Sequence, residues 1–488
     1  MKRKGYIMII IMAITLSVSA CVSDLDVVQK SYINKESMWK TESDMRGAMY
    51  GIFQQFRNAY RVNLSYWGDF RSGVIGAGMG SFNATDFVDN DLNSAETKGT
   101  NWGSLYTCIN DCNMVLKYAD GVTYGSDATK DEVKANAYFI RAYCYYTIAR
   151  VWGDAPLMLT GIESDKDSLY PERSPQAEVY ARVESDIDSA ENLMPASVIS
   201  RTTGSLAAVQ MLKTDFYLWK YRRLNGTKAD LDTADEACSA VLANGNYSML
   251  DNFADVFSPS NKDNDEVIFA IHLQMTTEEV ANYADDYLIP DSKYTDAEKY
   301  RDADSVATGS QDQWYSFSKS FQSFLYSVPG DTRAETSFKS FTVPETGNTY
   351  SWINKFPGEW VSNTRYFTSD IPIYRYDEAI LFKAEIENLK GGDPLKYLNR
   401  IAYRAYGVAD YYSSLSSESE INEAIYDERL KEFAAEGKSW WDAIRMGYAF
   451  TKIESLRGRQ NETNILLWPI SSACLEDNPN IRQTVGYN

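Results

Sequence analysis

The stretch that most constrains the fold is residues 131–151, because it predicts a long helix that is apolar on nearly every side. Ile140, Cys144 and Ile148 recur at four-residue spacing, which stacks them along one side of a helix. Aromatic rings cover the remaining sides: Phe139, Tyr143, Tyr145 and Tyr146. A helix without a polar face must be surrounded by other elements, so the chain needs further helices packed around this one.

Paired helices are predicted on both sides of this inner helix along the chain. Apolar residues at helical spacing, with capping residues and Gly or Pro at the ends, predict helices over residues 36–57, 102–119, 175–194, 205–224, 233–244, 374–390 and 394–406. In the first of these, Thr41 followed by Asp44 is typical of a capped helix start. Their arrangement in pairs resembles tetratricopeptide hairpins, although no regular repeat length fits. We therefore predict a mainly α fold built on a tetratricopeptide-like helical-pair scaffold.

A long loop-rich insertion is predicted at about residues 256–370, where Gly, Ser, Asp and Thr are frequent. Few strands are expected, and they are short. The clearest covers residues 266–274, whose apolar and β-branched side chains are typical of a strand. The scaffold then occupies about residues 35–255 and 371–450 of a single domain at residues 35–488.

The N-terminus predicts export and lipid attachment. Basic residues directly after the first Met precede a short apolar segment, which is typical of a signal peptide at residues 1–20. The sequence Val18-Ser19-Ala20-Cys21 resembles a bacterial lipobox. We predict that Cys21 carries acyl chains such as palmitate and anchors a tether at residues 21–34 to a membrane. A plain secretory signal that happens to end at a cysteine is the alternative.

Composition narrows the class of ligand. The net charge of -20 argues against a nucleic-acid partner. Aromatic residues make up 14% of the chain, more than a core needs, and such rings stack well on ligands with an apolar face. The single histidine, His272, and the scattered cysteines do not fit a zinc site or a disulfide framework. We therefore predict no catalytic residue, no metal and no cofactor.

A charged, aromatic helix is predicted late in the chain, over residues 427–447. Its glutamates recur at every fourth position and form one stripe: Glu428, Glu432 and Glu436. Carboxylates of a glycosidase must flank a bond from opposite sides of a cleft, which neighbours on one stripe rarely do. We interpret the stripe as scaffold, with Arg429 and Arg445 available as partners for carboxylates.

Several segments, in one order along the chain, resemble a known family. They are Met38-Trp39-Lys40-Thr41-Glu42, the Arg-Ala, aromatic and Gly-Asp-x-Pro pattern of residues 135–156, residues 369–385, the Glu-Gly-x-x-Trp-x-Asp segment of residues 436–442, and Leu467-Trp468-Pro469-Ile470 with Asn478-Pro479-Asn480. Together they resemble the SusD-like, or RagB-like, nutrient-binding outer-membrane lipoproteins of Bacteroidetes. One departure is that Lys438 and Ser439 stand where the family commonly has Arg or His.

The resemblance implies a binding protein that is not an enzyme and that has a SusD-like fold. It implies a lipid-anchored protein that serves as a lid on a TonB-dependent, SusC-like outer-membrane transporter. Oligosaccharides are the typical ligands, with peptides in some members. Asp24 and Asp26 after the lipobox resemble the signal that exports such lipoproteins to the cell surface. The resemblance transfers no ligand-contacting residue, because the family's binding residues lie on variable loops.

Candidate ligand-binding residues are therefore chosen by their chemistry and position, beside the long loop predicted at residues 65–101 and within the insertion. They are Trp67, Asp69, Arg71, Tyr287, Tyr294, Trp314 and Tyr315. Rings can stack on sugar C–H faces, and charged side chains can bond sugar hydroxyls. For each ring, packing beneath a loop is the alternative.

Other functions stay open on the sequence alone. A glycoside hydrolase would use two of the many carboxylates, although no catalytic pair stands out. A peptide-binding or structural subunit of the same transporter, or a surface adhesin, would lack affinity for soluble glycans. The main prediction is a surface-exposed lipoprotein that captures oligosaccharides and delivers them to its transporter.

Overall fold

The computed structural model describes residues 38–79, 85–96, 98–164, 166–274, 288, 313–361 and 364–487. The predicted signal peptide, Cys21 and the tether lie outside these residues. Within the described residues, no helix combines the length and the apolar character that crossing a bilayer requires.

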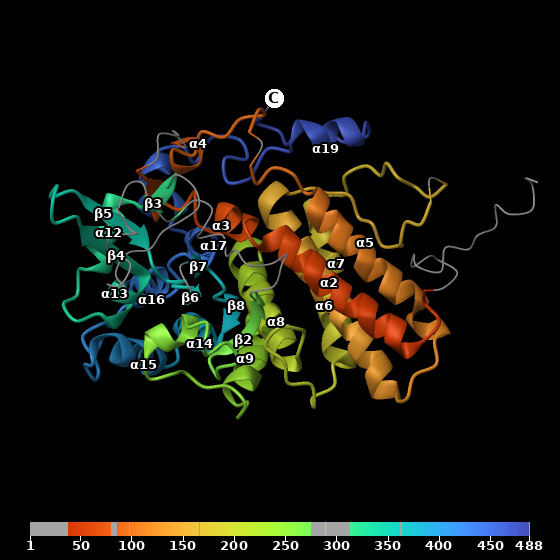
Figure 1. Cartoon of the computed structure of the whole chain (residues 1–488), viewed down its shortest axis with the longest axis horizontal. Helices are drawn as coiled ribbons and strands as arrows, with labels where there is room; N and C mark the ends of the chain where they lie inside the picture. The colour runs from red at the N-terminus through yellow and green to blue at the C-terminus, as the bar shows by residue number, and fades with distance from the viewer. Residues whose placement is uncertain are drawn as a thin grey trace, which may run out of the picture.

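Helices that follow one another in the N-terminal half of the chain pack side by side (Figure 1). They are α2 (Glu42–Tyr60), α5 (Gly103–Tyr118), α6 (Asp127–Trp152), α7 (Gln176–Leu193), α8 (Leu206–Arg223) and α9 (Lys228–Leu242). The prediction for the inner helix is confirmed, because α6 is buried on all sides from Phe139 to Trp152. The predicted capping start of the first helix is also confirmed, since Asp44 N–H donates to the Thr41 hydroxyl.

The scaffold resumes after the insertion with α14 (Tyr376–Lys390), α15 (Leu395–Tyr406) and α16 (Glu418–Glu432). Helix α14 packs against α9 on one side and against α15 and α16 on the other. It ends at Gly391, whose φ of 70° is the left-handed conformation that closes many helices. The C-terminal half thereby continues the helical array of the N-terminal half.

The prediction of one helix over residues 427–447 is wrong. Helix α16 ends at Glu432, and a separate short helix, α17 (Ser439–Arg445), follows a turn in which Ala435 and Gly437 have positive φ values. A Cβ at Gly437 would lie 2.6 Å from the Leu64 side chain. The turn is therefore set by close packing against α3 (Asn63–Gly68), which local periodicity cannot reveal.

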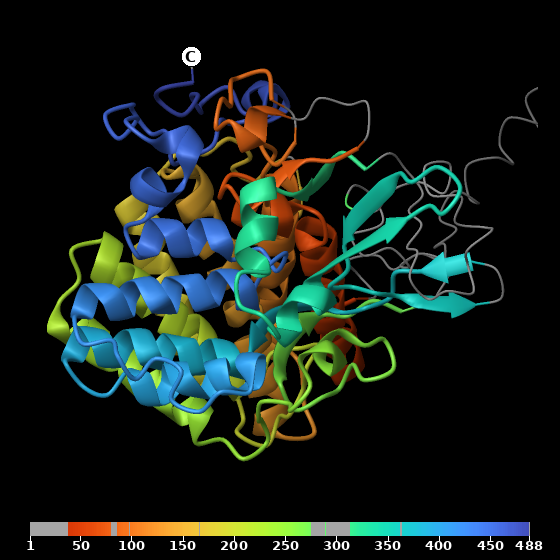
Figure 2. The ribbon, with the colours of Figure 1, turned by 90° about the vertical axis from the view of Figure 1, so that its left-hand side faces the viewer.

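The strands are short and form four antiparallel pairs within the described residues. The pairs are β1 (Ile75–Ala77) with β3 (Tyr315–Phe317), β2 (Val267–Ile271) with β8 (Ile371–Arg375), β4 (Phe338–Thr342) with β5 (Thr349–Ile353), and β6 (Glu359–Val361) with β7 (Thr364–Tyr366). Figure 2 shows the β4–β5 and β6–β7 ribbons projecting from one side of the helical array. The predicted combination of a helical scaffold with few short strands is confirmed.

Several short helices lie between the longer elements along the chain. They are α4 (Thr85–Val88), α12 (Lys319–Leu325), α13 (Thr332–Ser337), α18 (Ala449–Lys452), the 3-10 helix η4 (Glu454–Leu456) and α19 (Ser472–Asp477). The prediction of a continuous loop at residues 65–101 needs correction, because this stretch contains the end of α3, strand β1 and helix α4. Buried rings of Phe70 and Phe87 hold these elements against the core.

Candidate functional site

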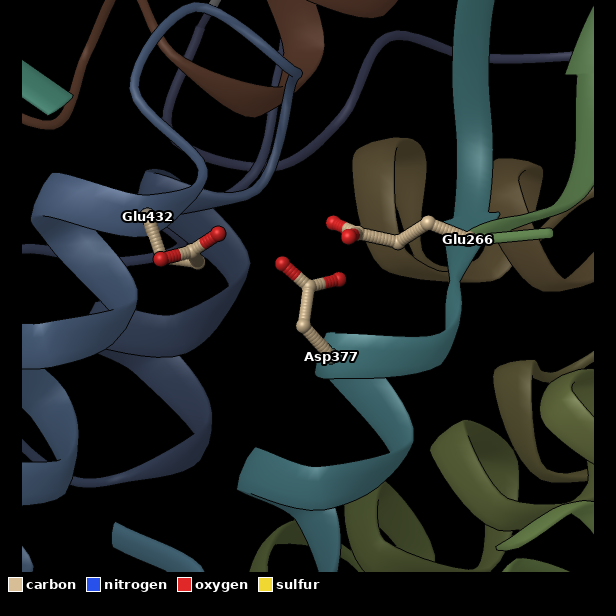
Figure 3. Close-up of side chains that lie close together, drawn as sticks. All are labelled: Glu266, Asp377 and Glu432. Atoms are coloured by element: carbon tan, nitrogen blue, oxygen red, sulfur yellow. The ribbon is translucent and has the colours of Figure 1, made fainter. Parts of the chain in front are cut away.

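Three buried carboxylates converge in the core between β2, α14 and α16. Figure 3 shows Glu266, Asp377 and Glu432 pointing toward one another, and an oxygen atom of each lies within 4.8 Å of the others. Carboxylate oxygens are the ligands that Ca²⁺ and Mg²⁺ prefer. The geometry alone would therefore fit a divalent cation.

Guanidinium groups already bind these carboxylates. Arg404 Nη1 lies 2.6 Å from Glu266 Oε2, and its Nη2 lies 2.5 Å from Glu432 Oε1. Arg375 Nη1 lies 2.7 Å from Glu266 Oε1 and also binds Asp377. The cationic partners occupy the positions that a metal would need. The group is therefore a network of buried ion pairs, and we call it the ionic cluster.

The glutamate stripe belongs to the ionic cluster. Arg333 Nη1 lies 2.6 Å from Glu428 Oε2, while Glu436 binds Arg375 at 2.8 Å and Lys355 at 2.5 Å. Their burial agrees with a scaffold role. The cations that bind the stripe are Arg333, Arg375, Arg404 and Lys355.

Arg429 and Arg445 bind other carboxylates. Arg429 binds Glu378 and Asp442, and Arg445 binds Glu385 and Asp442. Arg429 lies on α16 and Arg445 on α17, and the prediction that both arginines serve as partners for carboxylates is confirmed.

The charges of the ionic cluster depend on one another. Burial alone would raise the pKa of Glu432, but Arg404 and Arg333 outweigh burial and hold that pKa well below its usual value. For Asp377, burial dominates over Arg375 and raises the pKa well above its usual value. Such a cluster is costly to disturb, because removing one partner leaves an uncompensated buried charge.

The predicted ligand contacts of Trp67 and Asp69 are not available in this structure, because both side chains are buried in the core. Trp67 Nε1 donates to Gly99 O at 2.7 Å. Asp69 accepts hydrogen bonds from Gly437 N at 2.7 Å and from the Ser439 hydroxyl at 2.6 Å. Asp69 therefore ties α3 to the turn before α17, and a ligand in solvent cannot reach either side chain.

Arg71 is likewise buried, with 0% of its surface exposed. It donates to Asn90 Oδ1 at 2.7 Å, to Leu467 O at 2.9 Å and to Ile465 O at 2.5 Å. These bonds connect the β1 region to the C-terminal segment, so the side chain serves the fold. Its prediction as a ligand contact is corrected for the same reason as those of Trp67 and Asp69.

Trp314 and Tyr315, the two candidate ligand contacts at the start of β3, differ in exposure. Tyr315 is completely buried and packs on Phe70, with ring centroids 4.3 Å apart, so its prediction as an exposed ring is wrong. Trp314 is only partly buried, and the Lys98 ammonium lies 3.7 Å from its ring centroid. Trp314 directly precedes β3, whose three residues are all buried. Tyr287 and Tyr294 lie outside the described residues.

A hollow of about 640 Å³ lies beside the other end of the β1–β3 ribbon. We call it the α12 groove, because α12 forms one wall and α16, α18 and η4 face it. Its lining is Ser72, Gly73, Val74, Ile75, Val88, Asp89, Ser318, Ser320, Phe321, Phe324, Tyr426, Asp427, Leu430, Lys452, Glu454, Ser455 and Arg457. The size is that of a small-ligand site.

Hydrogen bonds fix the wall of the groove. Ser318 begins α12 by accepting from Phe321 N–H, and its hydroxyl also donates to Gly73 O at 2.7 Å. The Ser455 hydroxyl donates to Val88 O at 3.0 Å. Burial raises the pKa of Asp427, on the opposite wall, to about 6.

Sequence reasoning did not identify the α12 groove. Its lining comes from five separate segments of the chain, and no local pattern links them. The available signals were the pair Phe321 and Phe324 in the insertion, and Tyr426 next to Asp427 at the start of the late charged stretch. Each pair alone is typical of ordinary helix packing.

The fold and the groove define a class of protein, a helical-repeat scaffold that carries a ribbon-bearing face with a ligand-sized hollow. A family model described as "Starch-binding associating with outer membrane" matches residues 30–218, and the model of the SusD family matches residues 238–487. The chain belongs to the SusD family, as the sequence motifs predicted.

Individual relatives agree over nearly the whole length. The chain is 24% identical to a SusD-like protein of Formosa agariphila, over 100% of both chains. It is 22% identical to the starch-binding protein SusD of Bacteroides thetaiotaomicron, over 78% of this chain and 76% of that protein. Among solved structures, B. fragilis NanU has a TM-score of 0.81 and 28% identity, over 94% of this chain and 99% of that chain.

Proposed function

We propose that this protein is a surface-exposed lipoprotein that captures oligosaccharides and delivers them to a TonB-dependent, SusC-like outer-membrane transporter. It binds and does not catalyse. The observation that carries the proposal is the match of both halves of the chain to starch-binding and SusD family models. The lipobox at Cys21 supports attachment to the outer membrane, and the acidic residues after it support a position on the cell exterior.

The composition supports a sugar ligand. An acidic chain rich in tyrosine and tryptophan suits an uncharged ligand that has both apolar faces and hydroxyls. Among the predicted contacts, Trp314 has a partly exposed ring in the described residues and stands at the edge of the β1–β3 ribbon. We propose Trp314 as a stacking contact, and Tyr287 and Tyr294 remain proposed contacts on sequence grounds.

Binding of the mature lipoprotein, kept in detergent, to an array of neutral and acidic oligosaccharides tests the proposal. We expect retention of neutral oligosaccharides without release of shorter products. Release of products would support the glycoside hydrolase alternative instead. Binding of peptides alone would favour the peptide-binding alternative. Binding of neither oligosaccharides nor peptides would favour a structural subunit of the transporter.

The transporter and the anchor need separate tests. Affinity purification from detergent-solubilised outer membranes is expected to recover a TonB-dependent transporter with the protein. Replacement of Cys21 by Ala is expected to remove the acyl mass and release the chain from the membrane fraction. If the wild-type chain carried no acyl mass and the C21A chain stayed in the membrane fraction, the lipid anchor would be wrong.

A further inference from the structure

The α12 groove has the construction of a sugar-binding site. Its floor carries side chains that are apolar or aromatic, Phe321, Phe324 and Leu430, and serine hydroxyls such as that of Ser320 stand at its rim. Sugars combine C–H faces with hydroxyl groups, so a floor of this kind matched with a polar rim complements both. Figure 2 shows the teal α12 standing between the blue C-terminal helices and the ribbons.

Asp427 supplies an acceptor that the fold does not use. Within the described residues, its carboxylate has no hydrogen-bond or ion-pair partner, although it is partly buried. Lys452 also lines the groove but forms its ion pair with Glu423. A partly buried carboxylate without a partner loses hydration that a bound hydroxyl would restore.

The charge of the lining selects the ligand class. Its acidic residues are Asp89, Asp427 and Glu454, and its basic residues are Lys452 and Arg457. The positive and negative charges nearly cancel, so the lining creates no strong electrostatic potential that would attract an anionic or cationic ligand. An uncharged, hydroxyl-rich ligand fits this lining best.

We propose that the α12 groove is a second contact region for a neutral oligosaccharide, in which Phe324 and Leu430 support a sugar face and Asp427 accepts sugar hydroxyls. The inference rests on the proposed function and adds a site at the opposite end of the β1–β3 ribbon from Trp314. A chain of several sugar units would then lie along the ribbon and contact both ends.

Two serines of α12 provide a matched pair of variants. Ser320 and Ser323 are both exposed, but only Ser320 lines the groove. The substitution Ser320→Trp places an indole in the groove, whereas Ser323→Trp places the same ring outside the lining. Asp427→Asn keeps the size of the side chain and removes its charge, so it tests the acceptor without blocking the space.

The mature lipoprotein and its variants would be titrated with the neutral oligosaccharide that the wild type retains most strongly on the array. We expect Ser320→Trp to weaken binding by about tenfold or more and Asp427→Asn by about fivefold. Ser323→Trp should bind as the wild type does. Equal melting temperatures of the two tryptophan variants would show that the loss comes from the groove.

The outcomes separate the groove from the proposed function. If the wild type, Ser320→Trp and Asp427→Asn all bind a neutral oligosaccharide equally well, the assignment of the α12 groove as a sugar-binding region is wrong. The proposed function of the protein is then unaffected. If the wild type retains only acidic oligosaccharides, the assigned ligand class is wrong. If the wild type retains no oligosaccharide, the proposed function fails and the groove assignment fails with it.

Discussion

Helix α16 carries carboxylates in two opposite environments. Glu432 is completely buried and binds Arg333 and Arg404, whereas Asp427, earlier on the same helix, faces the α12 groove without a partner in the described residues. The residue types are nearly the same. The partner and the access to solvent therefore decide whether such a carboxylate serves the fold or is free to bind a ligand.

The comparison predicts that changes in the ionic cluster act on stability. Arg375→Ala should lower the free energy of unfolding by about 3 to 5 kcal/mol, because it leaves several buried carboxylates without a cation. Chemical denaturation measures the loss, and Arg482→Ala, at an exposed arginine outside the α12 groove, is the control. If the Arg375→Ala chain were as stable as the wild type but had lost its glycan affinity, the ionic cluster would belong to the binding site. The contrast between the structural Glu432 and the ligand-binding Asp427 would then be wrong.

Trp441, the second of two adjacent tryptophans in the family segment, also serves the fold. Trp441 is 6% exposed, and the Arg150 guanidinium lies 4.5 Å from its ring centroid. Trp441→Ala should cost about 3 to 5 kcal/mol of unfolding free energy through the cavity that it leaves. The affinity of the folded fraction should be preserved, and Trp441→Phe should lose less stability. A normal melting temperature with lost binding would contradict this assignment.

The buried ion pairs also predict a pH dependence of stability. Burial opposes ionisation of Glu385, but Arg445 and Arg222 outweigh it and lower the pKa from 4.5 to about 2. Its contribution is therefore complete above about pH 4.5 and is lost as the pH falls toward 2. The loss amounts to about 3 kcal/mol at most.

The matched variant is Glu385→Gln, whose unfolding free energy should fall less than that of the wild type between pH 5 and pH 3. Asp69 acts in the opposite sense, because burial raises its pKa to about 6. The difference between variant and wild type is therefore the quantity to measure. Parallel curves for the two proteins would show that Glu385 is not held ionised by its arginines.

The smallest expected change in stability concerns the ribbon edge. Trp314→Ala should weaken binding of a neutral oligosaccharide by about tenfold, since it removes a stacking ring, with little change in melting temperature. Tyr403→Ala removes a ring that is 60% exposed on α15 and should bind normally. Unchanged affinity in Trp314→Ala would remove Trp314 from the site and leave the α12 groove as the candidate.

Local pattern predicted much of the scaffold. The apolar periodicity of residues 131–151 identified the inner helix α6, and Thr41 with Asp44 identified the start of α2. Such features depend on neighbours in the chain, through backbone bonding and side-chain spacing. The ordered motifs were equally local, and they identified the SusD family without reference to any tertiary contact.

The placement of charged and aromatic side chains required the tertiary structure. Arg333 meets Glu428, and Gly437 meets Asp69, across long stretches of chain. No spacing rule shows these contacts, so the sequence did not identify the cations that bind the stripe, and it placed the buried Tyr315 among the candidate ligand contacts.

The sequence by itself determined a mainly helical chain of the SusD family, because these features depend on the local order and spacing of residues. Only the tertiary structure decided that Trp67, Asp69 and Arg71 support the fold, while Trp314 and Asp427 stay accessible. The physical reason is that burial and pairing depend on which distant segments meet when the chain folds.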